Sequence, residues 1–324
     1  MLELQLFGTG QARYCDYPLP GFPNQQSYLL LCYLLLNRHH PHHRERLAAL
    51  FWSEYPTTSS RKYLRNALWR LRHALQSVGA PGDEYLLISD DSISFVSSSR
   101  YWLDVEAFET TITRYQDLSE QELTPEQAAH LEEAVDLYVG DLLEGVYEDW
   151  CLYDRERLSL LHLNALSKLM VFHELNGTYE RGLAYGERIL ARDHTREKVH
   201  RQMMRLYWLL GDRNAALAQY KRCVQVLRED LGIPPMEETR LLYKRMVHSQ
   251  SDPSTGSGER PTSRPVRHED PLSITIKSDD SVQPLAEHAL QKLQRLQAII
   301  EETSVELRYI ERLISKALLH SRHS

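Results

Sequence analysis

A period of 34 residues in the middle of the sequence is the feature that most limits the folds open to this chain. Gly177 and Gly211 are 34 residues apart, in the segments NGTYERGLAYGERIL and LGDRNAALAQYKRCVQVL. The same shift aligns three further pairs, which are Leu183 with Leu217, Ala184 with Ala218, and Leu190 with Val224. A 34-residue period with small residues where helices cross is typical of tetratricopeptide repeats, whose helix pairs stack around a continuous core. The sequence therefore predicts an all-α, tetratricopeptide-like domain over residues 101–248.

Two repeats are too few to form a stable stack, so we expect helices within residues 101–176 to complete the layer. One of these helices has a clear start, because Thr124 can cap it and Pro125 occupies its first position. The segment EDWCLYDRERLSLLHLNALSKLMVFHELNG predicts a long amphipathic helix before the first repeat.

The first hundred residues have a different pattern. LELQLF alternates apolar and polar residues, as a half-buried strand does, and QARYC can return as a second strand after Gly8 and Gly10. Helices are predicted from Gln25 to about Asn37, over RERLAALFW, and from Ser59 to Gly79, where the hydroxyls of TTSS can cap the third helix. YLLISDDSISFVSS then reads as a hairpin. This order predicts a winged helix-turn-helix over residues 1–100, in a protein that is mainly α with a small β component.

The third predicted helix contains no acidic residue, although the whole chain has a formal net charge of -7. Its leucines Leu64, Leu68, Leu71 and Leu75 form one apolar stripe. The other side carries the candidate DNA-binding residues Arg61, Lys62, Arg65, Asn66, Trp69, Arg70 and His73. A helix face without carboxylates suits the phosphates of DNA, and Arg and Asn side chains can also hydrogen-bond to base edges. Arg72 points nearer to the core, where it can pair with an acidic side chain or reach a phosphate.

Charge is divided unevenly along the chain. Residues 1–100 hold 10 Lys+Arg and 8 Asp+Glu, whereas residues 101–250 hold 18 and 26. Because helical-repeat domains commonly bind proteins, the acidity of the second region predicts a basic partner or segment. The alternative is that this region only packs against the winged helix and orients it.

Both regions resemble one family. RERLAALFWSEYPTTSSRKYLRNALWRLRHAL resembles the OmpR-like winged helix of the SARP-type (antibiotic regulatory protein) bacterial activators. DVEAFE, LYVGDLLEG with EDW, the turn Gly211-Asp212-Arg213 and YKRCVQVLREDLGIPP resemble the bacterial transcriptional activator domain of that family. The likeness covers about residues 1–248. It implies that the third helix enters the major groove of double-stranded DNA, with Arg61, Lys62, Arg65, Asn66 and Arg70 as contacts, and that the hairpin reaches the minor groove. It further implies repeated promoter half-sites and contacts between protomers and with RNA polymerase.

The end of the chain departs from the family pattern. Residues 249–284 are rich in Pro, Ser and Gly and predict a disordered linker. Residues 285–320 carry a heptad pattern that predicts a coiled-coil-like helix. Its candidate oligomerisation residues are Leu293, Leu296, Ile300, Leu307, Ile310 and Ile314. The stripe can be buried in a homo-oligomer or against the activator domain of the same chain.

The sequence contains none of the common catalytic or metal-binding motifs that we considered. It has no Gly-Lys-Ser/Thr phosphate loop, no HExxH helix and no GxSxG turn, and its four cysteines have no metal-binding spacing. The tract from His39 to His43 reads as a solvated loop rather than a metal site. The longest apolar run, from Tyr28 to Leu36, is too short to span a membrane, and no signal peptide is evident. We therefore expect a cytoplasmic, DNA-binding activator without a catalytic site, metal or cofactor. Two rival functions remain open, a protein-binding adaptor without direct DNA readout and a ligand-gated sensor.

Overall fold

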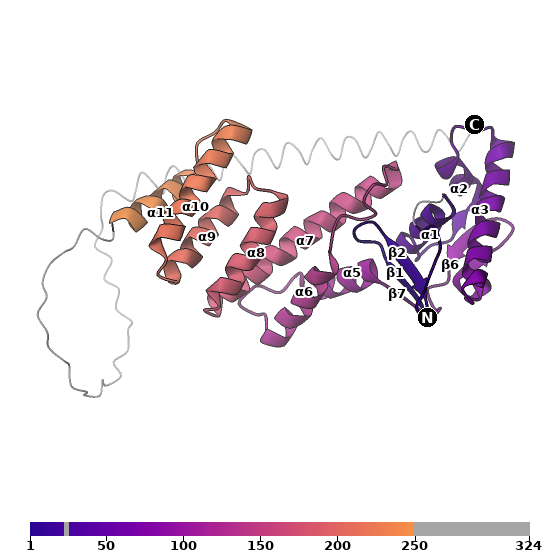
Figure 1. Cartoon of the computed structure of the whole chain (residues 1–324), viewed down its shortest axis with the longest axis horizontal. Helices are drawn as coiled ribbons and strands as arrows, with labels where there is room; N and C mark the ends of the chain where they lie inside the picture. Colours follow the sequence, from indigo (N-terminus) through magenta and orange to yellow (C-terminus); the bar gives the residue numbers. More distant parts are fainter. Residues whose placement is uncertain (23–25, 249–324) are drawn as a thin grey trace, which may run out of the picture. The chain divides into compact units, whose positions relative to one another are not determined.

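The computed structural model describes residues 1–22 and 26–248 (Figure 1). The predicted linker at 249–284 and the predicted heptad helix at 285–320, with its oligomerisation residues, lie outside the described residues. Among the residues described, no helix combines the length and the hydropathy needed to cross a bilayer.

The chain begins in a small four-stranded sheet. Its strands are β1 (Leu2–Gln5), β2 (Gln11–Tyr14), β3 (Tyr17–Pro18) and β7 (Tyr101–Leu103), in the spatial order β3-β2-β1-β7. The predicted return strand is confirmed, because β2 pairs antiparallel with β1 through a turn in which Gly8 and Gly10 both have positive φ. β7 pairs parallel with β1 and was not predicted, since three residues are too few to show a period.

The winged helix-turn-helix is built from three main helices, a short fourth one and a second sheet. The helices are α1 (Gln26–Leu36), α2 (Arg44–Phe51), α3 (Thr57–Ser77) and α4 (Gly82–Tyr85). The strands are β4 (His42–His43), β5 (Leu86–Ile88) and β6 (Ser92–Phe95), in the order β4-β6-β5. β5 and β6 form the predicted hairpin, which serves as the wing.

The remaining described chain is helical. Its elements are α5 (Asp104–Tyr115), α6 (Pro125–Leu137), α7 (Asp149–Leu175), α8 (Tyr179–Arg192), α9 (Glu197–Leu209), α10 (Arg213–Val226), the π-helical turn η1 (Leu227–Leu231) and α11 (Glu237–His248). Thr124 caps α6 in a capping box with Gln127, as its sequence predicts. Gly177 lies in the turn before α8 and Gly211 in the turn before α10. Their φ angles are 71° and 80°, a conformation that favours glycine. The repeat prediction is therefore confirmed at both turns.

Small residues lie at the helix crossings, as the repeat pattern predicts. Ala184 and Ala218, which the 34-residue shift aligns, are exposed and do not lie there. Gly182 and Ala216, which are also 34 residues apart, are buried there instead. A Cβ atom on Gly182 would lie 3.1 Å from Leu206 Cδ1 and 3.3 Å from the carbonyl oxygen of Met170. The 34-residue shift was right, but spacing alone could not show which small residue faces the neighbouring helices.

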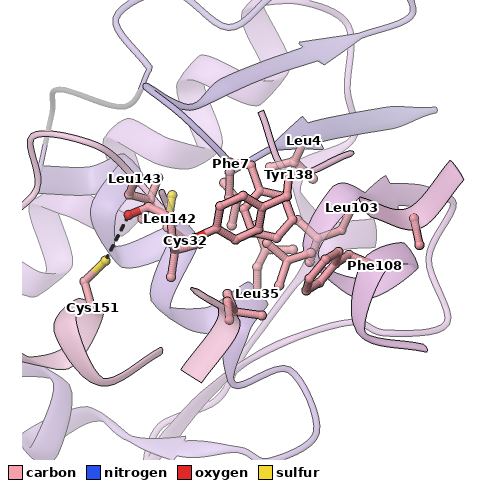
Figure 2. Close-up of a cluster of buried hydrophobic side chains, with 14 of the residues drawn as sticks. Leu4, Phe7, Cys32, Leu35, Leu103, Phe108, Tyr138, Leu142, Leu143 and Cys151 are labelled. Atoms are coloured by element: carbon pink, nitrogen blue, oxygen red, sulfur yellow. Dashed lines mark hydrogen bonds between the residues drawn. The ribbon is translucent and has the colours of Figure 1, made fainter. Parts of the chain in front are cut away.

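The winged helix and the helical region share a core. Figure 2 shows side chains from β1, α1, α5 and the segments around α6 and α7 packed together, including Phe7, Cys32, Phe108 and Tyr138. The loop after α6 also bonds to the end of β1, because Leu143 donates its N–H to the carbonyl of Leu6 at 2.8 Å. Residues 1–248 accordingly lie within one compact unit. The predicted boundary near residue 100 stays a prediction.

Candidate nucleic-acid interface

Helix α3 is held in place by one apolar stripe. Leu64, Leu68, Leu71 and Leu75 are all buried, as the sequence pattern predicts. The helix ends just before Gly79, whose φ is 81°, and the N–H of Ala80 returns to the carbonyl of Leu75 at 2.9 Å. Because this stripe is fixed against α1 and α2, the opposite side of α3 must face outward.

The start of α3 differs from the expectation. Thr57 and its neighbouring hydroxyls do not cap the helix, since Pro56 occupies the N-cap position and no side chain bonds there. Ser60 instead donates its hydroxyl to the carbonyl of Trp52 at 2.9 Å, within reach of the carbonyl of Tyr55 at 3.1 Å. The hydroxyls fell inside the helix because it begins two residues earlier than predicted, and Ser60 fastens the turn between α2 and α3.

All seven candidate residues lie on the exposed side of α3, namely Arg61, Lys62, Arg65, Asn66, Trp69, Arg70 and His73. The indole of Trp69 is 66% exposed, and it stacks on the ring of His73 with centroids 5.3 Å apart and planes 3° apart. An exposed, flat pair of rings beside cationic side chains is suited to contact a nucleic acid.

The cations on this side are not equivalent. Arg61 forms an ion pair with Glu45 of α2. In the described ranges 1–22 and 26–248, Lys62, Arg65 and Arg70 have no carboxylate within ion-pair distance. These three charges are therefore available for an anionic partner, whereas the charge of Arg61 is partly compensated.

Arg72 pairs with an acidic side chain of the protein, which is the first of the two alternatives that its position allows. Its guanidinium pairs with Asp83 of α4, and its Nε atom is buried. This matches its position toward the core side of the helix, so Arg72 is not among the free cations.

A cleft of about 580 Å³ separates α3 from the wing. It is lined by His43, Arg44, Glu45, Arg61, Leu64, Arg65, Asp90 and Asp91. Asp90 and Asp91 form the exposed tip of the hairpin. Since carboxylates repel phosphates, this tip is poorly suited to the minor-groove contact that the resemblance implies. The exposed side of α3 is better suited to an anionic partner than the hairpin tip is.

Sequence reasoning missed an aromatic pair beside this surface. Tyr55 and Tyr63 are exposed, and their rings meet edge to face with centroids 4.8 Å apart. Tyr55 precedes the helix, so no helical period links it to Tyr63. The histidine tract is also better defined than a loop, because His42 and His43 form β4 and pair with β6. Within the part of the chain that the structure describes, no group of three or more metal-ligating side chains is present.

Comparison with known proteins identifies the helical region. The family model described as the bacterial transcriptional activator domain matches residues 103–246. This region of the chain is therefore similar to bacterial transcriptional activator domains. The match begins at the last residue of β7 and ends within α11, so the matched residues supply part of the shared core as well as the two repeats.

Named relatives carry the likeness beyond the activator domain. The transcriptional regulatory protein MoaR1 of Mycobacterium tuberculosis is 24% identical over 258 residues, which is 76% of each chain. The transcriptional regulatory protein EmbR of the same organism is 24% identical over 269 residues, covering 77% of this chain and 64% of the relative. A solved structure of Mycobacterium tuberculosis EmbR in complex with a low affinity phosphopeptide superposes with a TM-score of 0.60 at 22% identity, covering 78% of this chain and 66% of that one. The resemblance to the SARP-type activators is confirmed, as is the combination of a winged helix with helical repeats.

Proposed function

We propose that this activator-domain protein is a cytoplasmic, non-enzymatic transcriptional activator that binds double-stranded promoter DNA through the exposed side of α3. Lys62, Arg65 and Arg70 supply charge for phosphates, and Asn66 has an amide suited to adenine. The observation that carries the proposal is that these three cations are exposed and unpaired in the described chain, on a helix without any carboxylate. The names of the relatives, both transcriptional regulatory proteins, support it.

The finer features of the proposal come from the family resemblance. The protein would bind as a pair on repeated promoter half-sites, with the activator domains in contact with each other or with RNA polymerase. The shared core supports this arrangement physically, because it fixes the direction in which α3 faces relative to the helical repeats. A rigid connection would convert half-site spacing into a defined spacing between activator domains.

The test is a fluorescence-anisotropy titration of the full chain on its own upstream DNA at several salt concentrations. The logarithm of the affinity should fall linearly with the logarithm of the salt concentration, with a slope of about 0.9 for each phosphate neutralised. The double variant Lys62→Ala with Arg65→Ala should bind far more weakly, and its slope should be smaller by about 2.

A matched control removes two cations elsewhere. Lys221→Ala with Arg228→Ala lowers the charge by the same amount on exposed positions of α10 and η1. It should retain the promoter affinity of the parent apart from a small general effect. If the Lys62/Arg65 variant, shown by circular dichroism to be folded, bound promoter DNA as the parent does, the site would be wrong. Failure of the parent to bind duplex DNA would favour the protein-adaptor function.

A further inference from the structure

The helical region is acidic as a whole, but the exposed side of α9 is not. Residues 101–250 carry 26 acidic and 18 basic side chains, which from sequence alone predicts a basic partner. Helix α9 is different, because Glu197 is its only acidic residue and its carboxylate is turned inward. That carboxylate is buried and accepts the N–H of Met236 at 2.7 Å. The exposed side of α9 is therefore free of negative charge.

Three cations follow one side of α9. Lys198, Arg201 and Arg205 are separated by three and four residues, a spacing that places them on one helix face. Lys198 and Arg205 are exposed, and neither has an ion-pair partner among the residues that the structure describes. Arg201 donates to the hydroxyl of Thr239 at 3.1 Å and pairs with no carboxylate in the same ranges. Lys198 and Arg205 thus keep their charges toward solvent, and the partly buried Arg201 between them carries a third positive charge.

An apolar groove of about 520 Å³ lies beside this stripe. Its walls come from α7 and α9, and the segment after η1 closes one side. Leu231, Ile233 and Met236 line it and are 51%, 49% and 61% exposed. Val171 of α7 adds an apolar contact on the facing wall. Large apolar side chains gathered at this exposure are typical of a protein-binding groove.

Few acidic groups oppose the cations at this groove. Glu120 and Glu197 line it, but the carboxylate of Glu197 is already held by the N–H of Met236. Glu174 of α7 accepts a hydrogen bond from Gln202 at 3.1 Å. Arg196, which also lines the groove, is held by Asp193. The balance at the groove is therefore apolar and cationic, although the surrounding domain is acidic.

We propose that this groove binds an acidic, amphipathic segment of a partner protein. Apolar side chains at helical spacing would occupy the space between Val171 and Ile233, and carboxylates would meet Lys198, Arg201 and Arg205. Duplex DNA fits this surface less well, because its phosphates would leave Leu231, Ile233 and Met236 without apolar partners. The site is separate from α3, and the inference does not depend on DNA binding.

The test measures binding of a synthetic probe to the full chain by fluorescence polarisation. The probe is a labelled peptide of about 16 residues with Leu at positions i, i+4 and i+7 and Glu at most others. A second peptide has the same apolar positions with Lys in place of Glu. The Glu peptide should bind saturably, at least about tenfold more tightly than the Lys peptide, and less tightly as salt increases.

Two variants locate the site. Lys198→Glu with Arg205→Glu should weaken binding of the Glu peptide by about tenfold or more. Lys221→Glu with Arg228→Glu makes an equal charge change outside the groove and should not weaken this binding. Ile233→Ser should weaken binding of both peptides by a smaller factor, since it removes an apolar contact. Circular dichroism establishes that each variant is folded.

The opposite results would overturn the inference. These are no saturable binding of the Glu peptide, equal affinity for both peptides, or equal loss in the two charge variants. Duplex DNA of unrelated sequence is the remaining competitor. If its binding fell in the Lys198/Arg205 variant and it displaced the peptide, the stripe would be a nucleic-acid surface and not a protein-binding one.

Discussion

The backbone N–H of Leu6 donates a bifurcated hydrogen bond to both carboxylate oxygens of Asp104, at 2.9 and 2.8 Å, across 98 residues of sequence. The N–H of Phe7 donates to the same carboxylate at 3.0 Å. Asp104 is the first residue of α5, and Leu6 directly follows β1. This contact fastens the sheet of the winged helix to the first helix of the activator region. Burial raises the pKa of Asp104, although the backbone hydrogen bonds oppose the shift.

Asp104→Ala should destabilise the chain by about 3 kcal/mol, because it leaves buried N–H groups of Leu6 and Phe7 without an acceptor. Urea unfolding followed by circular dichroism measures the change. Asp117→Asn, at an exposed position near the end of α5, provides the control and should alter stability by less than about 0.5 kcal/mol. Equal stability of Asp104→Ala and the parent would mean that the contact does not join the two regions.

His162 should make stability depend on pH. Its two ring nitrogens are buried and have no hydrogen-bond partner among the residues that the structure describes. Its ring stacks on Tyr138 with centroids 4.2 Å apart. Burial, aided by the charges of Arg188 and Arg192, lowers the pKa of His162 to about 4. The unfolded chain binds this proton near pH 6.5, so stability is lost as the pH falls from about 6.5 to about 4, by at most about 3 kcal/mol.

His162→Phe tests this pH dependence, since it preserves a stacked ring without a titratable group. The variant should lose less stability than the parent between pH 7 and pH 4, as judged from urea midpoints at about five pH values. Burial also lowers the pKa values of His173 and His200, so part of the dependence should remain. The exposed His40→Gln should behave as the parent. A curve for His162→Phe that matches the parent would contradict the assignment.

Arg61 and Arg65 should contribute unequally to DNA binding. Glu45 already compensates the charge of Arg61, whereas Arg65 has no such partner in the described chain. Arg65→Ala should therefore weaken promoter binding by about tenfold and Arg61→Ala by clearly less. Glu45→Ala should strengthen binding several-fold, because it frees Arg61 and removes a repulsive carboxylate. Anisotropy titrations at one fixed salt concentration compare the three, and a loss of affinity in Glu45→Ala would count against the proposed face.

The crossing at Gly182 should tolerate no β-branched side chain. Gly182→Val should lower the free energy of unfolding by about 2 kcal/mol. The added atoms would meet the side chain of Leu206 and the carbonyl of Met170, and this carbonyl belongs to the backbone of α7 and cannot move aside. Ala184→Val lies on the exposed side of the same helix and should cost only a few tenths of a kcal/mol. Thermal unfolding of the two variants checks the difference. A larger loss in Ala184→Val than in Gly182→Val would contradict the placement of the crossing at Gly182.

The amino-acid order by itself determined the elements that depend on neighbours along the chain. The leucine stripe of α3 set which side of the helix is buried, and with it the exposure of Arg65 and Trp69. The 34-residue shift located the turns at Gly177 and Gly211, and Thr124 marked the start of α6. These features rest on helical period, capping and backbone conformation, which act over a few residues and are visible in a local pattern.

Only the tertiary structure decided which distant groups meet. It brought Glu45 to Arg61, Asp104 to Leu6 and Gly182 to Leu206, and it turned the carboxylate of Glu197 inward so that one side of α9 is cationic. Net charge counts every side chain of a segment, whereas a partner meets only the side chains on one surface. The physical reason is that ion pairing and burial depend on distances in space, and the packing of the helices sets these distances independently of separation in the sequence.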